Sequence, residues 1–317
     1  MLRRFFRRRR LRPRHALVVL VVSFAAVGAV AWLSSPSPSS LTARVEGRLH
    51  GTSGKPVMLS QIARILQQAV VATEDKRFYG HHGVDVIGLV RAVPYDIAHL
   101  SFAQGASTIT EQVAKVLYLR GNDHTPWRKL QDAALALKIE SRYSKEQILT
   151  AYLNSAFFGD NAYGIWAASE RYFGVRPARL GTDQASLLAG LIQAPSAYDP
   201  FVHGELARAR QVEVLRSLVR TRALTATRAA AMLAHPLRLR GGTVLPPVTG
   251  VDLSAGPAFV WWELTLGAAI GLIALVALIG TRLLRVRAVR GVLAIRLALV
   301  AAVVIGAAAV VRSFRTA

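Results

Sequence analysis

Adjacent carboxylates at Glu74 and Asp75 are the first residues in the chain whose types and spacing could do chemistry. They end an apolar stretch and are followed by Phe78, His81 and Gly83. A carboxylate at the end of an apolar helix is partly desolvated, and desolvation raises its pKa towards that of a useful general base. An isolated Glu-Asp pair is more typical of surface charge, but a surface loop needs no such mixture of aromatic, imidazole and glycine. The pattern therefore favours Glu74 as a candidate base.

The segment QGASTITEQVAK predicts a helix that begins after Thr108, because Thr108 and Glu111 fit a capping box. Free backbone N–H groups at a helix start, beside small residues such as Ser107, are typical of an anion site. Lys115 follows about one turn further along and could add a positive charge. Taken alone, the segment is equally well explained as an ordinary capped helix.

A third cluster lies in PWRKLQDAALALKIESRY, where Arg128 and Asp132 are four residues apart and share one helix face with Lys129 beside them. The simplest interpretation is a surface salt bridge, which stabilises a helix by about 0.3–0.5 kcal/mol. The functional interpretation is a guanidinium and ammonium clamp for a diphosphate, because arginine forks match phosphate oxygens.

The elements that must position these side chains are predicted to be helical. Start signals occur at Thr125-Pro126 and at Ser144, a stop signal occurs at Gly174, and few stretches alternate as strands do. The expected organisation is a cytoplasmic basic tail with a membrane anchor, a linker, a mainly α domain of about 180 residues, a second linker and a C-terminal membrane hairpin. These parts are predicted at residues 1–33, 34–57, 58–240, 241–256 and 257–317.

Composition points to a membrane protein. The chain of 317 residues is 52% hydrophobic, with a mean hydropathy of +0.33 and a net charge of +22. Apolar windows at 16–33, 257–279 and 292–311 each approach the ~20 residues that cross a bilayer as a helix, which predicts three transmembrane helices. A cleaved signal peptide is the alternative for the first window. Basic residues flank the windows, so the positive-inside rule puts the large central domain outside the cell.

The same composition excludes several function classes. No cysteine is present, which excludes disulfides, thiolate zinc sites and cysteine catalysis. The basic runs flank apolar windows and are not interleaved with aromatic residues in the central domain. Nucleic-acid binding is therefore not expected.

Four motifs, in order, resemble the peptidoglycan glycosyltransferase family of monofunctional transglycosylases and bifunctional penicillin-binding proteins. The first, E-D-x-x-F-x-x-H-x-G, is matched in full from Glu74 onward. The second, G-x-S-T-I-T-Q-Q, departs at Glu111, and the third, R-K-x-x-E, departs at Asp132. The fourth, K-x-x-I-L-E-x-Y-L-N, departs at Thr150. The resemblance covers roughly residues 58–222, about half of the chain.

The resemblance implies a mainly α, lysozyme-like glycosyltransferase domain with a small membrane-proximal jaw. It implies transfer of a lipid diphosphate-linked glycan to the 4-hydroxyl of a lipid-linked disaccharide-pentapeptide, with inversion. Catalytic roles fall on Glu74, as general base, and on Asp132. No cofactor is certain; a divalent cation, Mg²⁺ or Mn²⁺, is the candidate, and its ligands are unknown. The implied substrate-binding residues are Asp75, Phe78, His81, Gly83, Ser107, Thr108, Gln112, Lys115, Arg128 and Lys129.

The implied partners are the lipid-linked peptidoglycan precursor, the growing glycan strand, the membrane and other cell-wall synthesis proteins. The implied location is the bacterial cytoplasmic membrane, with the catalytic domain on its outer face. No S-x-x-K or K-T-G motif occurs, so a transpeptidase half is not expected.

The three departures keep two alternatives open. Asp132 is one methylene shorter than glutamate, and Glu111 adds negative charge near the expected diphosphate site unless it turns back to cap Thr108. One alternative is therefore a catalytically weakened homologue that acts as a membrane scaffold. The other is a lysozyme-like hydrolase, which could use a comparable carboxylate pair but needs no diphosphate clamp.

Overall fold

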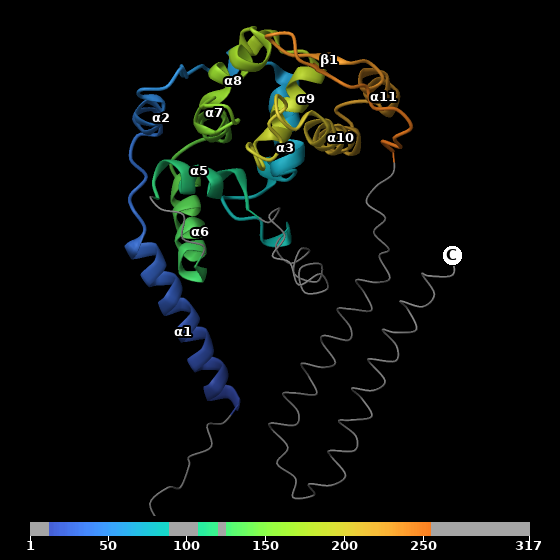
Figure 1. Cartoon of the computed structure of the whole chain (residues 1–317). Helices are drawn as coiled ribbons and strands as arrows, with labels where there is room; N and C mark the ends of the chain where they lie inside the picture. The colour runs from blue at the N-terminus through green and yellow to red at the C-terminus, as the bar shows by residue number, and fades with distance from the viewer. Residues whose placement is uncertain (1–12, 89–106, 120–124, 255–317) are drawn as a thin grey trace, which may run out of the picture. The chain divides into compact units, whose positions relative to one another are not determined.

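The computed structural model describes residues 13–88, 107–119 and 125–254, without the side chains of residues 13–20 and 24. The chain divides into two compact units, Met1–Phe259 and Val260–Ala317. All described residues belong to the first unit, and only that unit is considered below (Figure 1).

The described part of this unit is mainly α, as predicted. Its elements are α1 (Pro13–Ser34), α2 (Leu41–Leu49), η1 (Leu59–Gln61), α3 (Arg64–Glu74), η2 (Phe78–Gly80), α5 (Ile109–Leu117), α6 (Pro126–Glu140), α7 (Lys145–Ser155), α8 (Gly164–Phe173), η4 (Pro177–Arg179), α9 (Thr182–Leu191), α10 (Gly204–Arg220), α11 (Ala226–Leu233), β1 (Leu237–Arg238) and β2 (Val244–Leu245). The two short strands pair antiparallel, with Leu237 opposite Leu245.

Two groups of helices position the candidate site. Helix α3 packs against α9 and α10, and its inner residues Leu66, Ala69 and Val70 are fully buried (Figure 1). Helix α5 packs against α6 and α7. Because the first group carries Glu74 and the second carries the basic residues of α6, the site forms where the end of α3 meets α5.

The helix boundaries follow the local signals in the sequence. Side chains of Thr108, Thr125 and Ser144 each accept a hydrogen bond from a backbone N–H in the first turn of the following helix. Gly174 ends α8 in the left-handed conformation, with φ +67°. These predicted starts and this predicted stop are confirmed.

The segments predicted as linkers are partly folded into the domain. Residues 34–57 include α2, whose Leu41, Val45 and Leu49 recur every four residues and are buried in the core. Residues 241–256 include β2, and Leu245 and Leu253 are buried as well. The Ser, Pro and Gly content of these segments predicts turns, but it does not indicate that a few of their apolar residues pack into the core.

The prediction of a transmembrane helix is wrong for residues 16–33, the predicted span that lies within the described residues. Within residues 13–88, 107–119 and 125–254, no helix combines the length and the apolar character needed to cross a membrane. The window at 16–33 falls in α1, whose last turns pack against α6: Ala31 is 2% exposed, and Lys138 Nζ donates to the carbonyl of Trp32 at 2.6 Å. This packing is confined to the end of the helix: Val21, Val22 and Leu33 are 58%, 60% and 81% exposed. The windows at 257–279 and 292–311 lie outside the described residues.

Candidate active site

Glu74 is the last residue of α3, and its side chain is 12% exposed. Gln112 Nε2 donates a hydrogen bond to Glu74 Oε2 at 3.0 Å, and Arg210 Nη2 lies 3.9 Å from Glu74 Oε1. Burial raises the pKa of Glu74, while the Gln112 hydrogen bond and the Arg210 charge lower it in part. The result is a fixed, largely desolvated carboxylate, which is the state that a general base requires.

Asp75 is a buried residue that links the elements around the site. His81 Nε2 is 3.0 and 2.9 Å from its two carboxylate oxygens, and the backbone N–H of Ile109 donates to Oδ2 at 3.0 Å. Burial raises the pKa of Asp75, and the Ile109 N–H and then His81 lower it. Since Ile109 is the first residue of α5, this carboxylate ties the end of α3 to the start of α5.

Phe78 and Gly83 also act through packing. Phe78 is fully buried, and the Lys145 ammonium lies 4.5 Å from its ring centroid. Gly83 has φ +93°, and a Cβ there would lie 2.8 Å from the carbonyl carbon of Ala136 in α6. The Gly83 carbonyl accepts a hydrogen bond from Thr108 Oγ1 at 2.6 Å. The loop after Asp75 therefore crosses α6 at a point where only glycine fits.

Glu111 completes the predicted capping box at the start of α5. Its Oε2 accepts from the Thr108 N–H at 2.8 Å, and its own N–H donates to Thr108 Oγ1 at 3.1 Å. Its other oxygen lies 3.2 Å from Lys129 Nζ, and Lys129 also donates to Ser107 Oγ at 2.8 Å. One carboxylate thus caps α5 and holds a lysine of the candidate clamp.

Arg128 and Asp132 form the i,i+4 pair expected on α6, with Arg128 Nε 3.7 Å from Asp132 Oδ1. Among the described residues, Arg128 Nη2 and Asp132 Oδ1 are buried without any hydrogen-bond partner. Burial raises the pKa of Asp132, and the charges of Lys129, Arg128 and Lys115 lower it, against Glu111. Because buried polar atoms are costly when left unpaired, this basic cluster is suited to an anionic ligand.

The described residues offer few ligands for a divalent cation. In the described ranges, no group of three or more His, Asp or Glu side chains could hold a metal ion. Asp132 Oδ1 accepts no hydrogen bond, but Arg128 Nε lies 3.7 Å from it, and three basic residues lower the pKa of Asp132. The Mg²⁺ or Mn²⁺ candidate stays a prediction.

Sequence reasoning missed two residues that contact the base or its neighbour. Tyr152 on α7 donates from its hydroxyl to Gln112 Oε1 at 2.9 Å, which turns the Gln112 amide nitrogen towards Glu74. Arg210 reaches Glu74 from α10, far along the chain. Tyr152 stands within the fourth motif and could have been found there. Nothing local to Arg210 distinguishes it from its basic neighbours.

Thr150, the third departure from the motifs, lies away from these contacts. It is on α7, and its hydroxyl donates to the Glu146 carbonyl one turn earlier at 2.6 Å. The threonine hydroxyl is therefore satisfied within α7.

Comparison with known proteins agrees with this arrangement. A family model described as "Transglycosylase" matches residues 41–219, more than half of the chain. A protein of Cupriavidus necator named "Putative transglycosylase" is 40% identical over 230 residues, covering 71% of this chain and 95% of the relative. Penicillin-binding protein 1A of Neisseria lactamica is 42% identical over 184 residues, and that of Aquifex aeolicus is 40% identical over 189.

These alignments cover 57% and 58% of this chain but only 23% and 26% of the two penicillin-binding proteins. The chain thus spans about a quarter of those relatives and nearly all of the Cupriavidus protein. The helical domain, with its buried glutamate and basic cluster, is a transglycosylase domain. The chain belongs to the peptidoglycan transglycosylase family.

Proposed function

We propose that this chain polymerises the glycan strands of peptidoglycan. It transfers a lipid diphosphate-linked glycan to the 4-hydroxyl of a lipid-linked disaccharide-pentapeptide and releases polyprenyl diphosphate. The observation that carries this proposal is the pairing of a desolvated, oriented carboxylate at Glu74 with a basic cluster on α5 and α6. Family membership supports the same chemistry.

In the proposed reaction, Glu74 takes the proton of the acceptor 4-hydroxyl as that oxygen attacks the anomeric carbon of the donor. The bond between the anomeric carbon and the diphosphate oxygen breaks on the opposite side, so the anomeric configuration inverts. The bonding electrons leave with the diphosphate. Lys115, Arg128 and Lys129, with Ser107 and Gln112, stabilise the charge that builds on this leaving group.

Asp132 orients Arg128 in this scheme. A divalent cation could share the diphosphate with Asp132, but a single carboxylate that already pairs with Arg128 is a poor metal site, so no step depends on a cation. We place the domain at the outer face of the bacterial cytoplasmic membrane, where a lipid-linked precursor is accessible.

The test is polymerisation of purified lipid-linked disaccharide by the full-length protein in detergent, with products resolved by gel. Glu74→Gln should lower the rate by about 10²- to 10⁴-fold, the usual effect of losing a general base. Glu46→Gln is the matched control, because Glu46 is an exposed glutamate on α2. It should polymerise like the wild type.

Equal activity of Glu74→Gln and wild type would refute the role of Glu74. If folded wild-type protein makes no glycan while a known polymerase does so in the same assay, the proposed activity is wrong. The scaffold alternative would then be favoured.

A further inference from the structure

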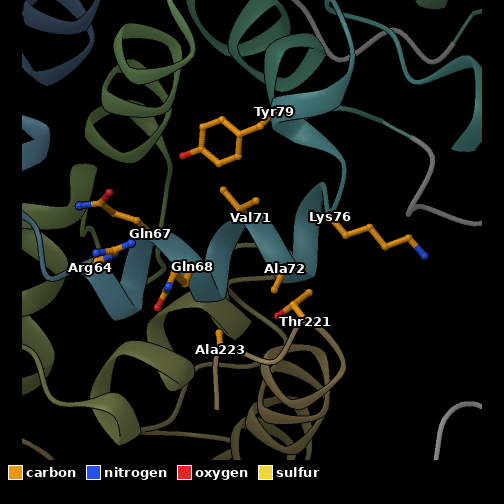
Figure 2. A pocket seen from close by; sticks show the side chains of 9 residues that line it. All are labelled: Arg64, Gln67, Gln68, Val71, Ala72, Lys76, Tyr79, Thr221 and Ala223. Carbon is orange, nitrogen blue, oxygen red and sulfur yellow. The ribbon is translucent and has the colours of Figure 1, made fainter.

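A pocket of about 380 Å³ lies along a face of α3 that the reaction scheme above does not use. Figure 2 shows α3 as its floor, with Tyr79 on one side and Thr221 and Ala223 on the other. Its lining residues are Arg64, Gln67, Gln68, Val71, Ala72, Lys76, Tyr79, Thr221 and Ala223. None of them is acidic, and two are cationic.

Several polar groups of this pocket are free to bind a ligand. Within the described ranges, the side chains of Arg64, Gln68 and Lys76 make no hydrogen bond or ion pair. Gln67 Nε2 donates to the carbonyls of Leu59 and Ile62 at 3.0 and 2.9 Å, which fixes the amide and leaves its oxygen as an acceptor. One amide held in place and two exposed cations without partners suit a ligand with hydroxyl, amide and carboxylate groups.

Tyr79 adds an apolar surface. Its side chain is 61% exposed, and its ring meets the buried Phe78 ring edge-on, with the centroids 5.1 Å apart. A tyrosine has an apolar ring face and a polar hydroxyl group. A pyranose likewise has an apolar face and polar hydroxyl groups, so the two are suited to pack together. The chemistry of the lining is therefore that of a saccharide site with room for a carboxylate.

The pocket lies on the same helix as the base. Val71, in its floor, precedes Glu74 by three residues, so the two side chains are neighbours on α3. From Arg64 to Ala72 the helix rises about 12 Å, enough for a ligand larger than one sugar ring.

We propose that this pocket binds the disaccharide-peptide part of the lipid-linked substrate, independently of its lipid and diphosphate. Arg64 and Lys76 pair with peptide carboxylates, Gln67 and Gln68 bond the sugar or peptide amides, and the Tyr79 ring packs on a sugar face. This inference rests on the proposed function and adds to it a substrate-recognition site separate from the basic cluster of α5 and α6.

The test is calorimetric titration of the full-length protein with water-soluble disaccharide-pentapeptide that carries neither lipid nor diphosphate. Gln68→Ala, Lys76→Gln and Tyr79→Ala should each weaken binding by about three- to tenfold, the effect of losing one hydrogen bond or ring contact. Tyr79→Phe, which keeps the ring, should bind as the wild type does. Arg228→Gln, which removes an exposed cation from α11, is the control and should change nothing.

Two further measurements locate the ligand. Lys115→Gln should leave this binding unchanged, because the probe has no diphosphate; an equal loss there would overturn the pocket assignment. The same disaccharide without its peptide should bind about tenfold or more weakly, since each lost charge-assisted hydrogen bond is strong. Equal affinity of the two probes would overturn the pairing of cations with peptide carboxylates.

Polymerisation kinetics separate failure of this inference from failure of the proposed function. If wild type polymerises, the pocket variants should raise KM for the lipid-linked substrate and leave kcat nearly unchanged, as expected for lost ground-state binding. Wild-type KM in those variants would overturn the inference alone. If the wild type does not polymerise at all, the proposed function fails, whatever the soluble probe binds.

Discussion

Gly83 sits where the loop after Asp75 crosses the backbone of α6, and Gly83→Ala should disturb both stability and activity. In the wild type, φ at this residue is +93°, a region that other residues rarely adopt. The added Cβ would lie 2.8 and 2.9 Å from the carbonyl carbon and oxygen of Ala136 and 3.0 Å from the Leu137 nitrogen. These are backbone atoms inside a helix, so no side chain can rotate away to make room.

Three costs follow from this geometry. Holding alanine at a positive φ costs about 1–3 kcal/mol. Relieving the overlap with α6 costs about 1–3 kcal/mol. If the loop moves instead, the 2.6 Å bond from Thr108 Oγ1 to the Gly83 carbonyl weakens, at about 0.5–1.5 kcal/mol. These three costs are not fully additive, because a movement of the loop that relieves the overlap also reduces the strain at Gly83. We therefore expect the free energy of unfolding to fall by about 3–5 kcal/mol.

The measurement is thermal unfolding followed by circular dichroism, with polymerisation assayed below the transition. A domain of this size should melt roughly 10 °C lower, at about 2–4 °C for each kcal/mol. Gly80→Ala is a matched control three residues away, because a Cβ at Gly80 meets no atom within 4 Å and its φ is not in the positive region. If Gly83→Ala melts together with Gly80→Ala and the wild type, the close approach to α6 is not a constraint and the reasoning fails.

Three other substitutions test the surroundings of the site. Arg210→Gln removes a positive charge that lowers the pKa of Glu74, so this pKa should rise and the acid limb of the pH–rate profile should move to higher pH; an unmoved limb would contradict the pairing. Glu111→Gln keeps a capping side chain but removes a negative charge near Lys129, so inorganic pyrophosphate should inhibit polymerisation at concentrations about two- to fivefold lower. Weaker inhibition would argue against an anion site there. Tyr152→Phe should reduce kcat by up to about tenfold while the fold persists, because it removes the donor that orients the amide beside the base.

The caps and the candidate base could be predicted from the sequence because their signals are local. A capping box joins residues three apart, so Thr108 and Glu111 had to meet once a helix formed between them. The same locality put Arg128 and Asp132 on one face of α6. The family motifs named Gly83 and Asp75 as candidate substrate-binding residues, but motifs do not say what a residue touches. Both act in the described structure by joining α3, α5 and α6.

The pattern of apolar residues predicts the surroundings of a segment less well, because it does not show which surface the segment packs against. Residues 16–33 read as a membrane span, whereas the end of α1 packs on α6 and takes hydrogen bonds from Lys138. Residues 34–57 read as a linker, whereas α2 places Leu41, Val45 and Leu49 in the core. For α2 the hydrophobic effect favours burial of the three leucine and valine side chains, and the packing decides which surface covers them. Along α1 the described apolar side chains stay largely exposed, and Ala31 is buried.

By itself, the sequence determined that the protein is mainly helical, where several of its helices begin and end, and that a carboxylate follows an apolar helix near a basic segment. Those features depend on residues within about one helical turn of each other. Only the tertiary structure decided that Arg210 and Tyr152 reach the surroundings of Glu74 and that Asp75 faces α5. The titration of Glu74 depends on that environment, because desolvation and charge act through space between helices that are distant along the chain.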